Sequence, residues 1–261
     1  MKELNPYTEH KGKQEIKNAP KDQFGNAKGT SYDLAKDGAF KGVSIAVLHL
    51  YTGEGFNFSL PLQALQEKGF SIIRWADTPP PISEFNKALE KVSQLWIISD
   101  RSPKLSQECL VSIKNFFDKG KGVYIWGDNE PFYADANQVS QFLIGVQMQG
   151  NVYGDKTVKV QVLEKNEGFV RHLITTGIEK LYEGVTIATI QDSPHLRPLL
   201  YGSAKNIVAS LYVREGKRLI IDGGFTRLYC NWDTAGTARY VKNAATWLTN
   251  FERFGNKIFH S

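Results

Sequence analysis

Carboxylate and amide side chains recur in this sequence directly after short apolar runs, where they could bind a ligand. Ligands of open parallel sheets bind outside the carboxyl ends of the strands, because loops and helix N-termini converge there. Oxygen atoms grouped in this way suit a hard cation such as Mg²⁺ or Ca²⁺, or a cationic or hydroxyl-rich ligand such as a sugar. The predicted ligand-binding residues are Glu54, Asp100, Asp128, Asn129, Glu130, Arg227, Tyr229 and Asp233.

Three of these acids could instead bind a metal ion or act in acid–base catalysis. Asp100, Asp128 and Glu130 are the candidate ligands of a divalent cation. Asp128 and Glu130 could also serve as the acid and base of a hydrolase. A structural role stays open, because Asp at the end of a strand commonly caps the following helix.

Cys230 is the candidate nucleophile at this edge of the predicted sheet, and His49 or His195 would have to serve as its base. His49 lies within a predicted strand, which favours a buried and hydrogen-bonded role. His195 lies in a predicted turn. Cys109 lies on the apolar face of a predicted helix, and we expect it in the core.

Other catalytic signatures are absent from the sequence. It contains no phosphate-binding GxxxxGK[ST], no GxGxxG after a strand, no HExxH and no GxSxG. The two cysteines lie far apart without a CxxC pair, which excludes a disulfide framework and a cysteine-based zinc site. No cofactor is therefore expected, apart from the Mg²⁺ or Ca²⁺ considered above.

Composition describes an ordinary globular chain. It has 261 residues, of which 41% are hydrophobic, and 32 basic against 27 acidic groups give a formal charge of +5. This small excess permits nucleic acid without indicating it. No apolar stretch of about 18 residues predicts a membrane span, and no apolar leader is visible, so we expect a cytoplasmic protein that binds no membrane.

Four apolar runs of strand length alternate with amphipathic segments in the first part of the chain. Strands are predicted over 43–51, 70–76, 94–99 and 123–127, and helices over 56–69, 82–92, 102–122 and 134–145. Ser102 is the predicted N-cap of the third helix, with Pro103 at its first position. The alternation predicts βαβ crossovers, and therefore an α/β three-layer sandwich around a mainly parallel, flavodoxin-like sheet.

The rest of the chain has a different pattern. We predict extended or hairpin structure over 146–164, a short helix or turn over 172–184, a strand over 185–190, a β-hairpin over 207–224 and a helix over 234–254. The hairpin would extend the parallel sheet. The chain thus divides into an arm over 1–41, one α/β domain over 42–254 and a tail over 255–261.

Residues 1–41 lack apolar periodicity and interleave lysines with acids, so we expect a disordered or loosely docked arm. If the arm bound nucleic acid, the affinity would be salt-sensitive and would disappear on its deletion. The interleaved acids favour a solvated tail instead.

Four local motifs resemble the class I glutamine amidotransferase-like superfamily and, within it, the ThuA-like (trehalose-utilisation) and related uncharacterised branches. They are IAVLHLYTGEGFNF, GKGVYIWGDNE, HLITTGIEKLYEG and RLIIDGGF, and the resemblance spans about 42–254. It implies a catalytic cysteine on the turn after the fourth strand and a histidine–glutamate pair after the last core strand. The matching positions here are Trp126-Gly127-Asp128-Asn129 and Phe225-Thr226-Arg227, with neither cysteine nor histidine.

The sequence therefore favours a non-catalytic amidotransferase-like domain that binds a small molecule or a partner protein at the carboxyl edge of its sheet. The alternative is a metal- or carboxylate-dependent hydrolase that acts on a sugar-like or amide substrate. The expected partners are a small molecule, another protein or a second copy of the chain in a homo-oligomer. Nucleic acid is not favoured.

Overall fold

The centre of the molecule is an eight-stranded sheet of order β2-β1-β3-β4-β12-β11-β10-β7. The computed structural model describes residues 19–161, 166–232 and 236–259. The parallel strands are β2 (Ser71–Ala76), β1 (Ser44–His49), β3 (Gln94–Ile98), β4 (Gly122–Trp126) and β12 (Lys217–Asp222). Three antiparallel strands continue the sheet, namely β11 (Ile207–Arg214), β10 (Leu196–Tyr201) and β7 (Gly168–Phe169). This topology confirms the predicted mainly parallel sheet with a hairpin extension.

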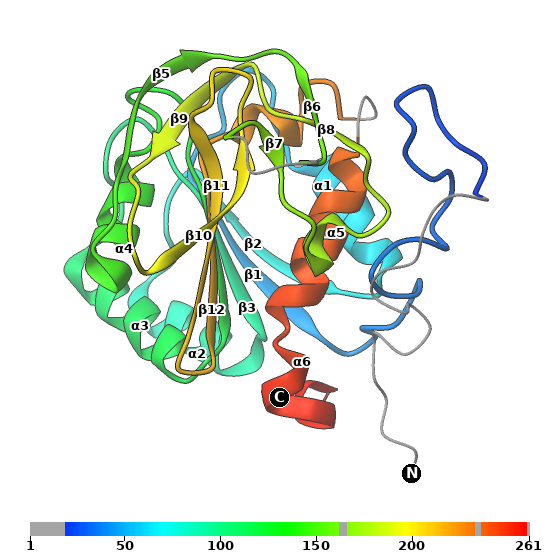
Figure 1. Cartoon of the computed structure of the whole chain (residues 1–261). Coiled ribbons are helices and arrows are strands. Elements are labelled where there is room, and N and C mark those ends of the chain that lie inside the picture. The colour runs from blue at the N-terminus through cyan, green and yellow to red at the C-terminus, as the bar shows by residue number, and fades with distance from the viewer. Residues whose placement is uncertain (1–18, 162–165, 233–235, 260–261) are drawn as a thin grey trace.

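Helices cover both faces of the sheet (Figure 1). One face carries α1 (Ser59–Glu67) and α5 (Thr237–Leu248), and the other carries α2 (Ile82–Lys91), α3 (Gln107–Asp118) and α4 (Ala134–Ile144). Side chains of β3 alternate between the two cores: Trp96 joins the α1/α5 side, while Leu95 joins the α2–α4 side. Strands covered on both faces are apolar throughout, which is why they were predictable as continuous apolar runs.

Two small antiparallel sheets add to this core. One pairs β5 (Met148–Tyr153) with β9 (Thr186–Ile190), and the other pairs β6 (Thr157–Lys159) with β8 (Lys180–Tyr182). The β5–β9 pair crosses the carboxyl end of β12, where the backbone N–H of Ala188 donates to the carbonyl of Gly223 at 3.0 Å. The only regular structure between residues 168 and 184, besides β7 and β8, is a short 3₁₀ helix, Leu173–Thr175.

The third helix begins later than its sequence predicts. Ser106, not Ser102, is the N-cap, and its Oγ accepts from the N–H of Cys109 at 3.3 Å. The preceding backbone is held by Asp135 of α4, whose carboxylate accepts from the N–H groups of Lys104 and Leu105 at 2.7 and 3.2 Å. The Asp135 carboxylate thus takes the place of the intrahelical hydrogen bonds expected of a helix that begins after Ser102.

The C-terminal helix predicted over 234–254 is interrupted. After α5, Asn250 adopts a left-handed conformation with φ 56°, and α6 (Phe251–Phe254) follows it. The Asn250 amide donates to the carbonyls of Gly120 and Gly216 at 3.0 and 2.8 Å, so tertiary contacts fix the break. Residues 255–259 form a 3₁₀ helix in which Ile258 is buried, so this part of the predicted tail belongs to the domain.

Residues 19–41 differ from the disordered or loosely docked arm that their sequence suggested. Leu34 and Phe40 are fully buried, and the Phe40 ring stacks on Phe70 with centroids 4.4 Å apart. Residues 1–18 lie outside the described part of the chain. The domain boundary predicted at residue 42 therefore does not separate the described part of the arm from the core.

Asp33 anchors this segment through three cations, one at the C-cap of α1 and two on α5. Its carboxylate lies 2.8 Å from Lys68 Nζ, 2.7 Å from Lys242 Nζ and 2.6 Å from Arg239 Nε, and it is completely buried. Burial opposes ionisation, but the charges of Lys242, Lys68 and Arg239 outweigh it and hold the pKa of Asp33 below its usual value. The interleaved charges of this segment are thus partly buried ion pairs.

No helix within the described ranges combines the length and the apolar character that crossing a membrane requires.

Asp33→Ala should destabilise the protein strongly, because it leaves buried cations without their shared counterion. Loss of one partner of a buried ion pair costs about 3–5 kcal/mol. Asp37 also pairs with Lys68, but its side chain is 48% exposed, so Asp37→Ala should cost less than about 1 kcal/mol. Urea unfolding of both variants measures the difference, and equal losses would show that the Asp33 cluster does not anchor the segment.

Candidate functional site

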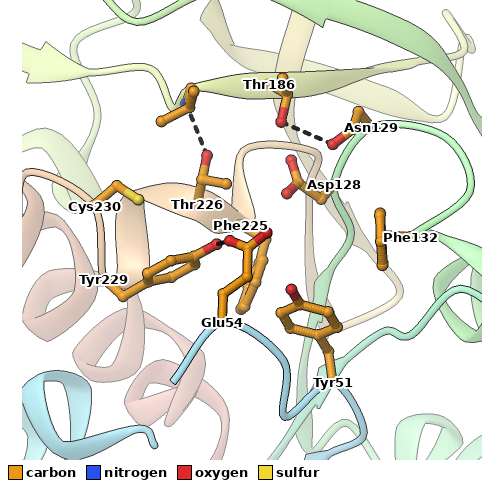
Figure 2. A pocket seen from close by; sticks show the side chains of 11 residues that line it. Tyr51, Glu54, Asp128, Asn129, Phe132, Thr186, Phe225, Thr226, Tyr229 and Cys230 are labelled. Atoms are coloured by element: carbon orange, nitrogen blue, oxygen red, sulfur yellow. Dashed lines mark hydrogen bonds between the residues drawn. The ribbon is translucent and has the colours of Figure 1, made fainter. Parts of the chain in front are cut away.

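A cavity of about 200 Å³ lies at the carboxyl edge of the parallel strands (Figure 2). Its walls come from the β1–α1 loop, the β4–α4 loop, the start of β9 and the segment after β12. The lining residues are Tyr51, Glu54, Asp128, Asn129, Phe132, Val185, Thr186, Phe225, Thr226, Tyr229 and Cys230. Four of the eight predicted ligand-binding residues therefore meet in one place, namely Glu54, Asp128, Asn129 and Tyr229, and the predicted nucleophile Cys230 lies beside them.

A buried ion pair beneath the cavity holds the segment after β12 in place. The guanidinium of Arg227 pairs with the carboxylate of Asp222, and both side chains are fully buried. The hydroxyls of Tyr124 and Tyr240 donate to Asp222 Oδ2 at 3.2 and 3.1 Å, and Arg227 Nε donates to the carbonyl of Gly224 at 3.0 Å. Arg227 was predicted to bind a ligand. The structure corrects this, because its side chain turns inward to Asp222.

The loop after β4 brings Asp128 to the cavity. Gly127 donates its N–H to the carbonyl of Asp222 and accepts from the N–H of Phe225, at 2.9 and 3.1 Å, so the loops after β4 and β12 are joined. A Cβ at Gly127 would lie 2.5 Å from Met148 Sδ, so a larger residue at this position would displace the Met148 side chain. Asn129 Oδ1 accepts from the Thr186 hydroxyl at 2.8 Å, which ties the loop to β9 as Figure 2 shows.

Asp128 is the least compensated polar group of the cavity. Its carboxyl points into the space between Thr186 and Glu54 (Figure 2). The residue is only 6% exposed, and its Oδ1 has no hydrogen-bond partner among the described residues. Burial raises the pKa of Asp128 to about 8, and the negative charge of Glu54 adds to this effect. The N–H of Asn129 and the charge of Arg227 act in the opposite direction.

Glu54 and two tyrosines form the outer side of the cavity. The Tyr229 hydroxyl donates to Glu54 Oε2 at 2.9 Å, a bond that links the β1–α1 loop to the segment after β12. Glu54 adopts a left-handed conformation with φ 53°. Tyr51 folds over its own loop, since a Cβ at Gly53 would lie 2.6 Å from the Tyr51 hydroxyl oxygen. Burial, followed by the charge of Glu54, raises the pKa of Tyr51.

Aromatic rings supply much of the remaining wall. Tyr51 packs edge-on against Phe132 and Phe225, with ring centroids 5.3 and 5.5 Å apart. Phe225 also contacts Tyr229 at 5.5 Å. The cavity therefore combines a few polar groups with rigid aromatic surfaces, the usual composition of a small-molecule site.

Cys230 lines the cavity, and no Lys, Arg or His is among the lining residues that the structure describes. The Nδ1 of His49 accepts from Arg74 Nη1 at 2.7 Å within the core, as predicted for a buried histidine, and the exposed His195 contacts Arg214. Burial raises the pKa of the Cys230 thiol, and the charges of Glu54 and Asp128 raise it further. This environment disfavours the thiolate that a nucleophile needs.

Other predicted site residues lie outside the cavity. Asp100 pairs with Lys104 at 2.9 Å and accepts from the N–H of Arg101, so its carboxylate is engaged within its own loop and does not cap α3, whose N-cap is Ser106. Glu130 is exposed, and Asp233 lies outside the described residues. Cys109 is buried in the core as predicted. Within the described ranges no group of three or more His, Cys, Asp or Glu is arranged to bind a metal ion, so Asp100, Asp128 and Glu130 do not form a joint site.

Two lining residues, Val185 and Thr186, were not predicted from the sequence. They come from the start of β9, and Val185 donates its N–H to Thr226 Oγ1 at 2.8 Å. The strand over 185–190 was predicted, but no pattern indicated that it crosses the carboxyl edge. Phe132 and Phe225 were available as aromatic residues in the candidate loops, and only their packing around Tyr51 assigns them to the cavity.

Comparisons with known proteins give a fold but no close relative. No protein-family model matches the sequence, and no curated protein matches it. A cytoplasmic protein from Salmonella typhimurium superposes with a TM-score of 0.54 at 12% identity, over 79% of this chain and 97% of its own. Proteins described as ThuA-like from Bacteroides uniformis and Parabacteroides merdae superpose with TM-scores of 0.51 and 0.53 at 12% and 11% identity. Each alignment spans 80% of this chain, and 91% and 90% of theirs.

These likenesses confirm the predicted resemblance at the level of the fold. The chain has a mainly parallel α/β architecture that ThuA-like proteins share, with a small cavity at the carboxyl edge of its sheet.

Asp128 should make the protein less stable as the pH rises from 3.8, the usual aspartate pKa, to about 8. In that window the folded state holds a proton that the unfolded state has lost. The free energy of unfolding contributed by this group therefore falls by up to about 1.4 kcal/mol per pH unit. Asp128→Asn removes this loss, so the variant should melt above the wild type at about pH 9, and the difference should shrink toward about pH 4.

Thermal melts across this range measure the effect, with Glu130→Gln as the exposed control that should follow the wild type. A constant difference between Asp128→Asn and the wild type at every pH would contradict the assignment of a raised pKa to Asp128.

Proposed function

We propose that this protein is a small-molecule-binding domain whose ligand occupies the cavity around Asp128. The observation that carries the proposal is the buried Asp128 carboxyl, which points into the cavity and whose Oδ1 has no hydrogen-bond partner in the described part of the chain. A buried polar group without a partner costs about 1–3 kcal/mol, so the folded protein gains by accepting a ligand that supplies the missing hydrogen bond.

The walls indicate the kind of ligand. Asp128, Asn129 and Thr186 offer polar groups on one side, and the aromatic rings of Tyr51 and Phe225 offer flat apolar surfaces on the other. Such a site suits a compact polar molecule with hydroxyl or amino groups, a sugar-like molecule among them. The volume of about 200 Å³ limits the enclosed portion to a small molecule.

A non-catalytic role is part of this proposal. Support comes from the absence of histidine among the lining residues and from the raised pKa of the Cys230 thiol. Glutamine hydrolysis by a cysteine–histidine pair would need the opposite arrangement. We also propose a cytoplasmic location, which the free state of Cys109 and Cys230 supports.

A ligand that fills the cavity should raise the melting temperature of the protein, because it binds the folded state alone. A thermal-shift screen of monosaccharides, polyols, small amines and divalent metal ions tests this. Asp128→Ala should weaken binding of any hit by at least about tenfold, or about 1.4 kcal/mol. Glu130→Ala is the matched control, since Glu130 is exposed and does not line the cavity.

If no compound shifts the melting temperature, or if Asp128→Ala binds each hit as the wild type does, the cavity is not the ligand site.

A second candidate function is a carboxylate-dependent hydrolase. The observation in its favour is that Glu54 and Asp128 line the same cavity, and that burial, together with the charge of Glu54, raises the pKa of Asp128. A carboxyl group with a raised pKa beside a second carboxyl group can act as a general acid at neutral pH. Asp128 would be the acid, because burial keeps it protonated up to about pH 8.

Chromogenic nitrophenyl glycosides and amides test the hydrolase directly. Glu54→Gln and Asp128→Asn should each lower kcat/KM by at least about 100-fold, whereas Glu130→Gln should not. Activity should fall as the pH rises through about 8, since the acid then loses its proton. A wild-type protein without measurable turnover would leave binding as the function.

A further inference from the structure

The ionisable side chains at the cavity are acids. Glu54 and Asp128 line it, and no Lys, Arg or His is among the described residues that do. Arg227 lies beneath, but its charge is matched by Asp222 in a buried pair. This acidic cavity lies in a chain whose formal charge is +5.

Two further acids contribute to the potential at the cavity. The charge of Asp155 acts on the Cys230 thiol, and the charge of Asp100 acts on the Tyr51 hydroxyl. Both are partnered, since Tyr182 donates to Asp155 at 2.6 Å and Lys104 pairs with Asp100 at 2.9 Å. The Asp128 Oδ1 therefore differs from these neighbours in being without a partner among the described residues.

The aromatic walls of the cavity also favour a positively charged ligand. The ring plane of Tyr51 lies at 78° to that of Phe132 and at 83° to that of Phe225, so edges and faces both line the cavity. Aromatic faces attract cations through their quadrupole, by about 0.5–2 kcal/mol depending on desolvation. An ammonium group can thus contact a carboxylate and a ring in the same cavity.

We propose that the ligand is a small primary amine bound as its ammonium ion, with Asp128 Oδ1 as the acceptor and Glu54 as the second negative charge. This inference rests on the proposed function, which requires only that the cavity bind some small molecule. A neutral polyol would satisfy the Asp128 hydrogen bond but would leave the Glu54 charge without a counterion and Asp128 protonated. An anion would be repelled by Glu54 and would oppose ionisation of Asp128.

Proton release accompanies binding in this arrangement. An ammonium ion stabilises the Asp128 carboxylate, so below about pH 8 binding expels the proton that burial retains. The groups that act on Asp128 from neighbouring elements are Glu54, Arg227 and the N–H of Asn129. The affinity for an amine that stays charged should therefore fall as the pH is lowered, by up to about tenfold per unit.

Two sets of molecules of matched shape and different charge test the inference by calorimetry with the full-length chain. One set is putrescine, butanediol and adipate; the other is glucosamine, glucose and glucuronate. At about pH 7 the amine of at least one set should bind at least about tenfold tighter than its hydroxyl counterpart, and the acids should bind least. Putrescine should bind more weakly at about pH 6 than at about pH 8.

Asp128→Asn has nearly the same shape without the charge, so it should lose at least about tenfold in amine affinity and little for the hydroxyl compound. Glu54→Gln, at the exposed rim, should give a smaller loss in the same direction, and Glu130→Gln should give none. Melting curves confirm that each variant is folded.

The outcomes separate the two proposals. If the hydroxyl compounds bind as tightly as the amines, or the acids bind best, the ammonium inference is overturned and the proposed binding function stands. If neither amine binds, the inference is overturned. The thermal-shift screen of the other compounds then decides whether the cavity binds a small molecule at all. Unchanged amine affinity in folded Asp128→Asn also overturns the inference.

Discussion

The buried pair of Asp222 and Arg227 is the interaction on which the site depends. Asp222 ends β12, and it accepts hydrogen bonds from Tyr124 of β4 and Tyr240 of α5. Strand β12, the neighbouring strand β4 and the covering helix α5 thus meet at the Asp222 carboxylate. Breaking such a pair leaves an uncompensated charge in the core, so each partner depends on the other for its stability. The segment from Phe225 to Cys230 starts from this fixed point and forms one wall of the cavity.

Much of the fold could be predicted because strands buried on both faces of a sheet appear in the sequence as continuous apolar runs. The four parallel strands and the helices between them follow from apolar runs and amphipathic spacing, and parallel topology then brings Asp128, Asn129 and Glu54 to one edge. Residue type alone gives no side-chain direction. Arg227 was therefore assigned to the ligand, although Asp222, five positions earlier, binds it in the core.

The parts that escaped prediction depend on partners far away in the sequence. Asp33 is separated by 206 positions from Arg239, and so the interleaved charges of residues 19–41 resembled those of a solvated tail. Thr186 belongs to the β5–β9 pair, whose position is not governed by the rules for βαβ units. The local sequence pattern indicates neither the contact of Asp33 with Arg239 nor the place of Thr186 in the cavity wall.

The hydrogen bonds that close the cavity have a consequence for how the protein folds. Tyr229 bonds to Glu54 across 175 positions, and Thr186 bonds to Asn129 across 57. Contacts at such separations carry a large loop-closure entropy and form late when local contacts form first. The cavity is thus completed only when the segments from Tyr51 to Cys230 have all assembled, so a chain that ends before Cys230 lacks one of its walls, and occupancy by a ligand reports that these segments have come together.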